Sequence, residues 1–360
     1  MNSKGNKLEA LQVLRAIAAG MVVYVHALST YKDKVATIDS LDWNYGFGEL
    51  GVKIFFCISG YIIFSSSQSL IPGWSSVNYF LRRRLIRVAP LYWCATLVYA
   101  AKLAMQGFAP KIDALVFSLF FVPFSDDAGL MRPVLGAGWT LNYEILFYFV
   151  LGFTLFGSRK FRLPIVVLFM TLLALTRGLG LLEQSVNFVI NAFFLLSESY
   201  LLFFVFGAMV LPLSKMEVVK YLPRFNWKVT CFLVLLLLSV LVFFSVCFKL
   251  TSVMLLFLEL IICSLSVLFC VLAKTTSEAT LVEQRVVMAG DGSYSTYLTH
   301  GFVMGPAARI LGAVPLGISP GVFAGSMVIV CTVVGMFLFK YFEYPLMTWM
   351  NSKWGKGKLK

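Results

Sequence analysis

Two ionisable side chains, Arg15 and His26, stand in residues 11–28, which are otherwise apolar enough to cross a membrane. An arginine at the centre of a spanning helix costs about 2.5 kcal/mol or more, so such groups mark sites lined by protein or water. The two residues are eleven positions apart, a turn of about 1100°, so they share one helix face about 16 Å apart along the axis. Because imidazole is suited to proton transfer near neutral pH, this face predicts acid–base chemistry inside the membrane.

An acidic residue in a later apolar segment offers a partner for that chemistry. Glu144 closes the segment Trp139-Thr-Leu-Asn-Tyr-Glu144. A carboxylate that orients or charges His26 would make it a competent general base. Glu144 could equally pair with Arg15 for structure alone. Two further acids in apolar runs are alternative partners of lower rank, Glu198 and Glu259.

The second histidine, His300, has Tyr297 and Tyr294 near it at helical spacing. A core histidine with its hydrogen bonds satisfied and a substrate contact are equally good interpretations of this pattern. We therefore take Trp139, Tyr297 and His300 together as candidate substrate contacts.

A basic run, Arg82–Arg87, precedes another apolar segment. It could serve only as a topology anchor. Within it, Arg84 and Arg87 are three residues apart and so lie on one helix face. Guanidinium groups bind phosphate oxygens in pairs, so this pair also suits a phosphate-bearing ligand that arrives from the cytoplasm.

The composition excludes a soluble protein. Hydrophobic residues make up 59% of the 360 residues, 34 are phenylalanine and only 13% are charged, more apolar surface than a soluble domain could bury. The net charge of +13 falls in clusters between apolar segments, which indicates membrane topology and contact with anionic lipid rather than nucleic acid. The cysteines lack metal-ligand spacing, so we expect no metal site.

We therefore predict an all-α polytopic membrane protein, a bundle of about ten transmembrane helices. Residues 1–345 would form the membrane domain and residues 346–360 a basic cytoplasmic tail. Residues 112–124 are too short to span, so residues 108–138 are expected to lie near the outer leaflet. The basic clusters then fall on one side, which places both termini in the cytoplasm. The predicted spans are 8–28, 47–67, 87–107, 139–157, 163–181, 187–213, 229–248, 252–273, 291–312 and 320–341.

The order of the motifs along the chain resembles acyltransferase family 3, the bacterial membrane-bound O-acyltransferases. The resemblance covers essentially the whole chain, with two departures: Lys53 stands where the family often has Asp, and Thr299 where it often has Trp. The matching motifs are Arg15-x10-His26, Gly51-Val-Lys-Ile-Phe-Phe-Cys-Ile-Ser-Gly-Tyr61, Arg82-Arg-Arg-Leu-Ile-Arg-Val-Ala-Pro-Leu-Tyr-Trp93, Gly138-Trp-Thr-Leu-Asn-Tyr-Glu144, Gly290-Asp-Gly-Ser-Tyr-Ser-Thr-Tyr-Leu-Thr-His300 and Tyr341-Phe-Glu-Tyr-Pro345.

The resemblance implies a multi-pass enzyme of the bacterial inner membrane that acylates sugars of surface or exported glycans. Its donor would be cytoplasmic acyl-CoA, acetyl-CoA in the simplest case, with no bound cofactor. The acceptor would be a polysaccharide or its lipid-linked precursor. The implied catalytic residues are His26, Arg15 and Glu144, and the implied acyl-CoA ligands are Arg84 and Arg87.

Two other functions fit parts of the pattern. Ionisable residues inside helices also mark transport paths, so a transporter of a lipid, sugar or anion is the alternative. The sequence shows no inverted repeat of the kind common in transporters. A purely structural subunit would leave Arg15 and His26 without a purpose.

Overall fold

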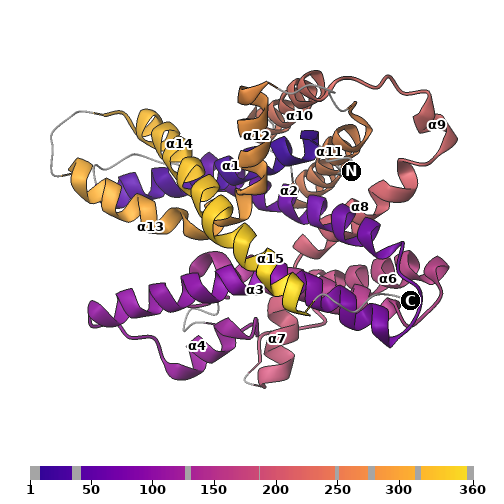
Figure 1. The fold of residues 1–360 in the computed structure, drawn as a ribbon, viewed down its shortest axis with the longest axis horizontal. Coiled ribbons are helices and arrows are strands. Elements are labelled where there is room, and N and C mark those ends of the chain that lie inside the picture. The colour runs from indigo at the N-terminus through magenta and orange to yellow at the C-terminus, as the bar shows by residue number, and fades with distance from the viewer. Residues whose placement is uncertain are drawn as a thin grey trace. The chain divides into compact units, whose positions relative to one another are not determined.

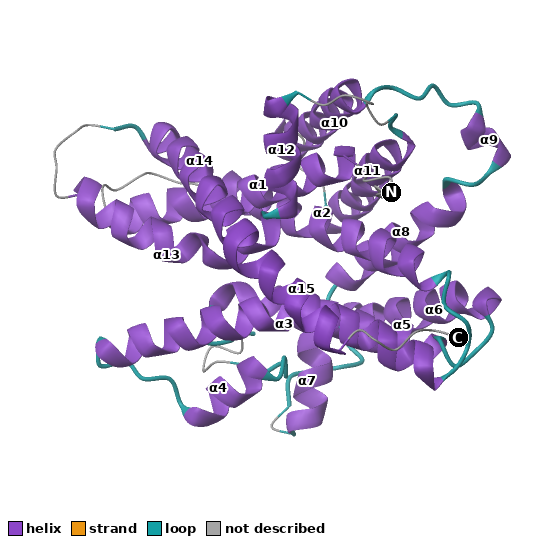
Figure 2. Cartoon of the chain, in the orientation of Figure 1, coloured by secondary structure: helices purple, strands orange, loops and turns teal. Residues whose placement is uncertain are grey.

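A computed structural model of the protein describes residues 9–34, 42–125, 131–185, 187–247, 251–274, 280–312 and 318–354. Within these ranges every regular element is a helix, as Figure 2 shows. The predicted all-α class is confirmed.

Each of the ten predicted apolar segments contains a helix. Four short helices lie outside them: α4 (Ile112–Leu119), the 3₁₀ turn η1 (Gly136–Gly138), α9 (Glu217–Lys220) and α12 (Leu281–Asp291). At the C-terminal end the π-helical turn η2 (Phe339–Glu343) leads into α15 (Tyr344–Trp354). The remaining helices are α1 (Glu9–Lys34), α2 (Asp42–Ser67), α3 (Trp74–Met105), α5 (Trp139–Thr154), α6 (Arg159–Gly178), α7 (Phe188–Leu196), α8 (Tyr200–Leu213), α10 (Trp227–Cys247), α11 (Ser252–Leu272), α13 (Ser293–Gly312) and α14 (Pro320–Leu338).

Fewer helices than predicted are long and apolar enough to cross a membrane. Among the described residues seven qualify, and an eighth if α7 and α8 count as one broken span. The predicted span 187–213 is not one straight helix, because α7 and α8 meet at an angle of 54°. Glu198 lies at this break and pairs with Arg177 (2.6 Å), so the polar group at the break has a partner.

The structure describes only parts of the predicted outer segment, residues 108–138, and of the predicted tail, residues 346–360. α4 has only eight residues, which agrees with the expectation that residues 112–124 are too short to span. Residues 126–130 and 355–360 lie outside the described residues. Which side of the membrane each terminus occupies stays a prediction.

The chain forms two compact units. Unit 1 comprises Met1–Ile58 and Val210–Tyr341, and unit 2 comprises Ser59–Met209 and Phe342–Lys360. In unit 1, α1 packs against α12, α13 and α14 (Figure 1). In unit 2, α3 packs against α4, α5 and α15.

Glycines allow the closest helix contacts in unit 1. A Cβ at Gly290 would lie 1.9 Å from the carbonyl oxygen of Gln12, so α12 meets the backbone of α1 there. A Cβ at Gly335 would lie 1.9 Å from Oγ1 of Thr296, which holds α14 equally close to α13. Small residues at such crossings are how membrane helices pack.

In unit 2 a buried arginine closes the end of α2. Arg162 is fully buried and donates hydrogen bonds to the carbonyl oxygens of Ser67 and Leu70. The last carbonyl groups of a helix have no N–H donor within the helix. The guanidinium of Arg162 provides a donor for the carbonyl of Ser67, the last residue of α2. Arg159 adds bonds to the carbonyls of Ser69 and Leu70, both 3.3 Å long.

Candidate active site

The two histidines of the chain meet in unit 1. Nε2 of His300 lies 3.3 Å from Nδ1 of His26, and the ring centroids are 4.9 Å apart at an interplanar angle of 87°. His300 is buried and His26 is exposed. The residues come from α13 and α1, which pack side by side (Figure 1). Sequence reasoning did not pair them.

An apolar cluster next to this pair holds the two helices together. The hydroxyl of Tyr31, a residue of the cluster, donates a hydrogen bond to the carbonyl oxygen of Ile318 (2.7 Å). The cluster joins α1, α13 and α14 through Val23, Ala27, Leu28, Tyr31, Met304, Ala308, Phe323, Ala324, Met327 and Cys331. Close packing of this kind fixes side-chain conformations, so the position of His300 is set by the core.

Arg15, the other ionisable residue of α1, is half-buried and donates a hydrogen bond to Gln12 (3.2 Å). Gln12 is also the residue against which Gly290 packs. The Gly290–His300 motif therefore begins beside one end of the Arg15–His26 face and finishes at the other. Two motifs far apart in sequence are thus in contact near both ends of the Arg15–His26 segment.

Tyr297, a candidate substrate contact, is buried and faces Phe55 with a centroid distance of 6.0 Å. Its carbonyl oxygen lies 2.6 Å from Nδ1 of His300. The tyrosine is thus part of the packing around His300, and substrate contact by its side chain stays a prediction.

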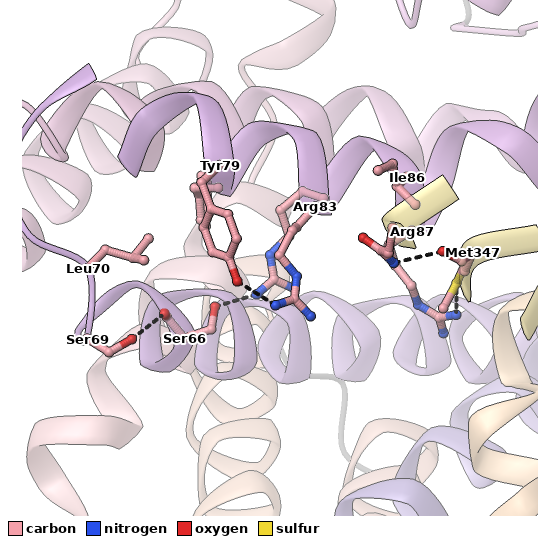
Figure 3. A pocket seen from close by; sticks show the side chains of 11 residues that line it. Ser66, Ser69, Leu70, Tyr79, Arg83, Ile86, Arg87 and Met347 are labelled. Atoms are coloured by element: carbon pink, nitrogen blue, oxygen red, sulfur yellow. Dashed lines mark hydrogen bonds between the residues drawn. The ribbon is translucent and has the colours of Figure 1, made fainter. Parts of the chain in front are cut away.

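Unit 2 contains a cavity of about 500 Å³ at the predicted arginine pair. Figure 3 shows Tyr79 and Arg83 extending from α3 toward Ser66 on the neighbouring helix. Arg83 donates to the hydroxyl of Tyr79 (2.6 Å), and Arg84 donates to that of Ser66. The full lining is Ser66, Ser69, Leu70, Tyr79, Phe80, Arg83, Arg84, Ile86, Arg87, Met347 and Asn351.

The predicted pair Arg84 and Arg87 therefore reaches one cavity, with Arg83 as a third guanidinium that the spacing argument missed. Arg87 differs from the other two because it forms an ion pair with Glu343, which is 2% exposed. It also contacts the sulfur of Met347 (3.3 Å), as Figure 3 shows. Arg87 thus binds the C-terminal helix α15, and α15 supplies one wall of the cavity.

The turn η2 explains how Glu343 reaches Arg87. It is a π-helical segment between α14 and α15, and Glu343 is its last residue. π-helical turns are rare and occur frequently at functional sites. Glu343 belongs to the motif Tyr341-Phe-Glu-Tyr-Pro345. This motif therefore supplies the carboxylate that pairs with Arg87.

Glu144 lies in unit 2, on α5. Its carboxylate accepts a hydrogen bond from the hydroxyl of Tyr148 (2.7 Å) and a longer one from Ser59 (3.4 Å). It is also close enough to Arg84 to interact with it electrostatically. Its pairing with His26 or Arg15 stays a prediction. In the described contacts the negative charge of Glu144 acts instead on Arg84, which lines the arginine cavity.

Trp139 begins α5 in an aromatic cluster. Its ring lies 5.2 Å from that of Tyr200 and 5.9 Å from that of Tyr143, centroid to centroid. Tyr143 also donates to the carbonyl oxygen of Leu195 (2.9 Å), beside the break between α7 and α8. Through these contacts the start of α5 packs against α7 and α8 on both sides of the break between them.

Lys53 and Glu259 form a buried ion pair in unit 1. Nζ of Lys53 lies 2.8 Å from Glu259 and 2.9 Å from Glu49. Glu259 was a lower-ranked partner for His26 and Glu198 another, but these acids bind Lys53 and Arg177 respectively. Lys53 is one of the two positions at which the chain departs from the family pattern. Its buried charge is offset by the carboxylate of Glu259.

Comparison with known proteins places these motifs in a family. Residues 8–341 match acyltransferase family 3, described as an acyltransferase domain. The chain belongs to this family. No solved structure matches it.

Two curated relatives match parts of the acyltransferase family 3 chain. It is 41% identical over 130 residues to the exopolysaccharide production protein ExoZ of Rhizobium meliloti (strain 1021), which covers 34% of this chain and 39% of that protein. It is 29% identical over 180 residues to an O-acetyl transferase of Shigella phage Sf6, which covers 45% of this chain and 50% of that protein. The matches span half or less of each relative.

Proposed function

We propose that this family member is an O-acyltransferase of the bacterial inner membrane. It transfers an acetyl or other short acyl group from cytoplasmic acyl-CoA to a sugar hydroxyl of an exported polysaccharide or its lipid-linked precursor. The family match over residues 8–341 is the observation that carries the proposal. The names of the two relatives support an exopolysaccharide acceptor and an acetyl group.

In this mechanism His26 is the general base. Its imidazole takes the proton of the sugar hydroxyl as that oxygen attacks the thioester carbonyl carbon. The carbon–sulfur bond breaks, and the proton passes from the imidazolium to the departing CoA thiolate. The products are the sugar ester and free CoA. Arg15 would stabilise the negative charge that develops on the carbonyl oxygen.

Arg83 and Arg84 would hold the phosphates of the donor. Guanidinium groups bind phosphate oxygens by charge-assisted hydrogen bonds. Three of them line one cavity, and Arg87 is already paired with Glu343, so the first two are the stronger donor ligands. With both termini in the cytoplasm, this end of α3 would face the donor.

The test compares the glycan of the producing bacterium with and without the gene, by mass and by NMR. Loss of one acyl mass from a sugar would identify donor and acceptor together. Purified protein in lipid nanodiscs should also transfer labelled acetyl from acetyl-CoA to that glycan, and a transporter would not. If a His26→Gln protein that inserts normally retains full transfer, the proposed mechanism is wrong.

The same assay separates two routes to the ester. In one route the sugar oxygen attacks acetyl-CoA directly, and in the other His26 is acylated first. Rapid denaturation at neutral pH in the absence of acceptor should leave label on the protein only in the second route, and hydroxylamine should release that label.

A further inference from the structure

The hydrogen-bond partners of His300 determine which of its nitrogens carries the proton. Nδ1 of His300 faces the carbonyl oxygen of Tyr297 at 2.6 Å. A carbonyl oxygen can only accept a hydrogen bond, so Nδ1 is the protonated nitrogen. In the neutral ring Nε2 then carries the lone pair and is an acceptor.

A doubly protonated His300 is disfavoured by its surroundings. The residue is 5% exposed, and it packs beside the apolar cluster of α1, α13 and α14. A charge in such a place needs an opposite charge or water to offset its lost hydration. Neutral His300, with one donor and one acceptor nitrogen, is satisfied by the two contacts described.

The state of His26 follows from that of His300. The acceptor Nε2 of His300 faces Nδ1 of His26 at 3.3 Å, so this Nδ1 must donate and carries the proton of the neutral ring. Among the described residues, no hydrogen bond uses Nε2 of His26. The imidazole therefore presents its lone pair at Nε2, on the exposed side chain.

We propose that His300 is a positioning residue that fixes His26 in the tautomer with its lone pair at Nε2. This inference rests on the proposed function, in which that lone pair takes the hydroxyl proton. In hydrolases with a catalytic triad an acid orients the base in the same way. Here a neutral imidazole does so, held by the backbone of α13.

The composition makes the proposal directly measurable, because the chain contains only two histidines. Protein labelled with ¹⁵N-histidine, carrying an affinity tag without histidine and reconstituted in bilayers, gives solid-state NMR signals from four ring nitrogens. We expect each ring to show a protonated Nδ1 and a bare Nε2, with His26 Nδ1–H close to His300 Nε2. A protonated Nε2 on His26 would overturn the proposal.

Two substitutions separate positioning from packing. His300→Phe keeps a ring without an acceptor, so His26 should become a mixture of tautomers and kcat should fall about tenfold, the effect of one hydrogen bond. The KM for acetyl-CoA should not change. His300→Gln can place an acceptor oxygen near the same point and should recover most of the rate. Met304→Leu, in the neighbouring cluster, is the packing control and should leave the His26 signals unchanged.

The outcomes also separate this inference from the proposed function. If the parent protein transfers no acyl group, the proposed function fails whatever the spectra show. If His26→Gln retains full transfer, the general-base role of His26 fails. If His26→Gln is inactive but His300→Phe has normal kcat or an unchanged His26 tautomer, only the positioning role fails. A His300→Phe protein with raised KM for the glycan and normal kcat would instead make His300 a substrate contact.

Discussion

The candidate sites of the two units are built differently. In unit 1 the two histidines, His26 and His300, contact each other. In unit 2 three arginines line one cavity, and one of them, Arg87, is paired with Glu343. A base needs one fixed partner and one unused nitrogen, whereas a bound phosphate needs several donors. On the proposed function, this contrast fits proton transfer in unit 1 and donor binding in unit 2.

The largest effect expected from this contrast is at His26. His26→Gln should lower kcat by about 10²- to 10⁴-fold, the contribution of general acid–base catalysis. The KM for acetyl-CoA should stay close to the parent value, because the proposed donor site lies in unit 2. Steady-state transfer assays in nanodiscs measure both constants. A raised KM with little change in kcat would reverse the assignment of the units.

The next effect tests Glu144, which packs in unit 2 but is predicted to serve His26. Glu144→Gln keeps an acceptor oxygen but removes the charge that would stabilise an imidazolium. We expect a large loss of kcat, with KM for acetyl-CoA nearly unchanged.

Glu198→Gln and Glu259→Gln are the controls, since each also removes one negative charge. Each also removes the partner of a basic side chain, Arg177 or Lys53, so activity is compared per amount of folded protein. On that basis both should retain more activity than Glu144→Gln. If Glu144→Gln instead weakens only donor binding, this carboxylate acts on the arginine cavity through Arg84 and Tyr148.

At the arginine cavity we expect Arg84→Ala to raise the KM for acetyl-CoA about tenfold or more, since hydrogen bonds to charged groups contribute about 1.5–3 kcal/mol. Added salt should also weaken binding, because it shortens the Debye length from about 8 Å at physiological ionic strength and so weakens the attraction between exposed charges. Arg84→Lys should rescue only partly. Titration of CoA against each purified variant measures the affinity directly.

Arg87→Ala should differ from Arg84→Ala by lowering thermal stability as well. It leaves the buried Glu343 without its partner arginine, a loss of about 3 kcal/mol. The double variant Arg87→Ala/Glu343→Gln should recover much of that stability. If Arg87→Ala binds CoA poorly and melts like the parent, Arg87 is a donor ligand rather than the anchor of α15.

The smallest effect concerns packing rather than chemistry. Gly290→Ala would push α12 away from α1 at Gln12, and such overpacking costs about 1–3 kcal/mol. We expect a lower melting temperature and a lower yield. Gly325→Ala is the control, because a Cβ there meets nothing within 4 Å. Equal melting temperatures for the two variants would show that α12 adjusts without cost.

Much of the fold could be predicted from apolar segment lengths, because a span must satisfy its own backbone as a helix. The break between α7 and α8 at Glu198 could not be predicted. An acidic residue in an apolar segment indicates that the residue needs a polar partner, but it does not indicate that the helix is broken there. The placement of Arg15 and His26 on one helix was predictable, because they belong to one apolar segment. The contact between His26 and His300 was not, since it joins residues 274 positions apart.

The arginine cavity shows the same limit. The spacing of Arg84 and Arg87 predicted a shared face, and both line the cavity. Nothing in that spacing indicated that Arg87 binds Glu343, which lies 256 positions away. Local periodicity gives the face of a helix, whereas the partner depends on how distant helices pack.

The ion pair of Lys53 and Glu259 has a consequence for how this sequence can change over evolution. Losing either residue alone leaves a buried charge without its main partner, which costs more than exchanging both. We therefore expect the two positions to covary among homologues. Where a relative has Asp at the position of Lys53, the position of Glu259 should carry a neutral or basic residue.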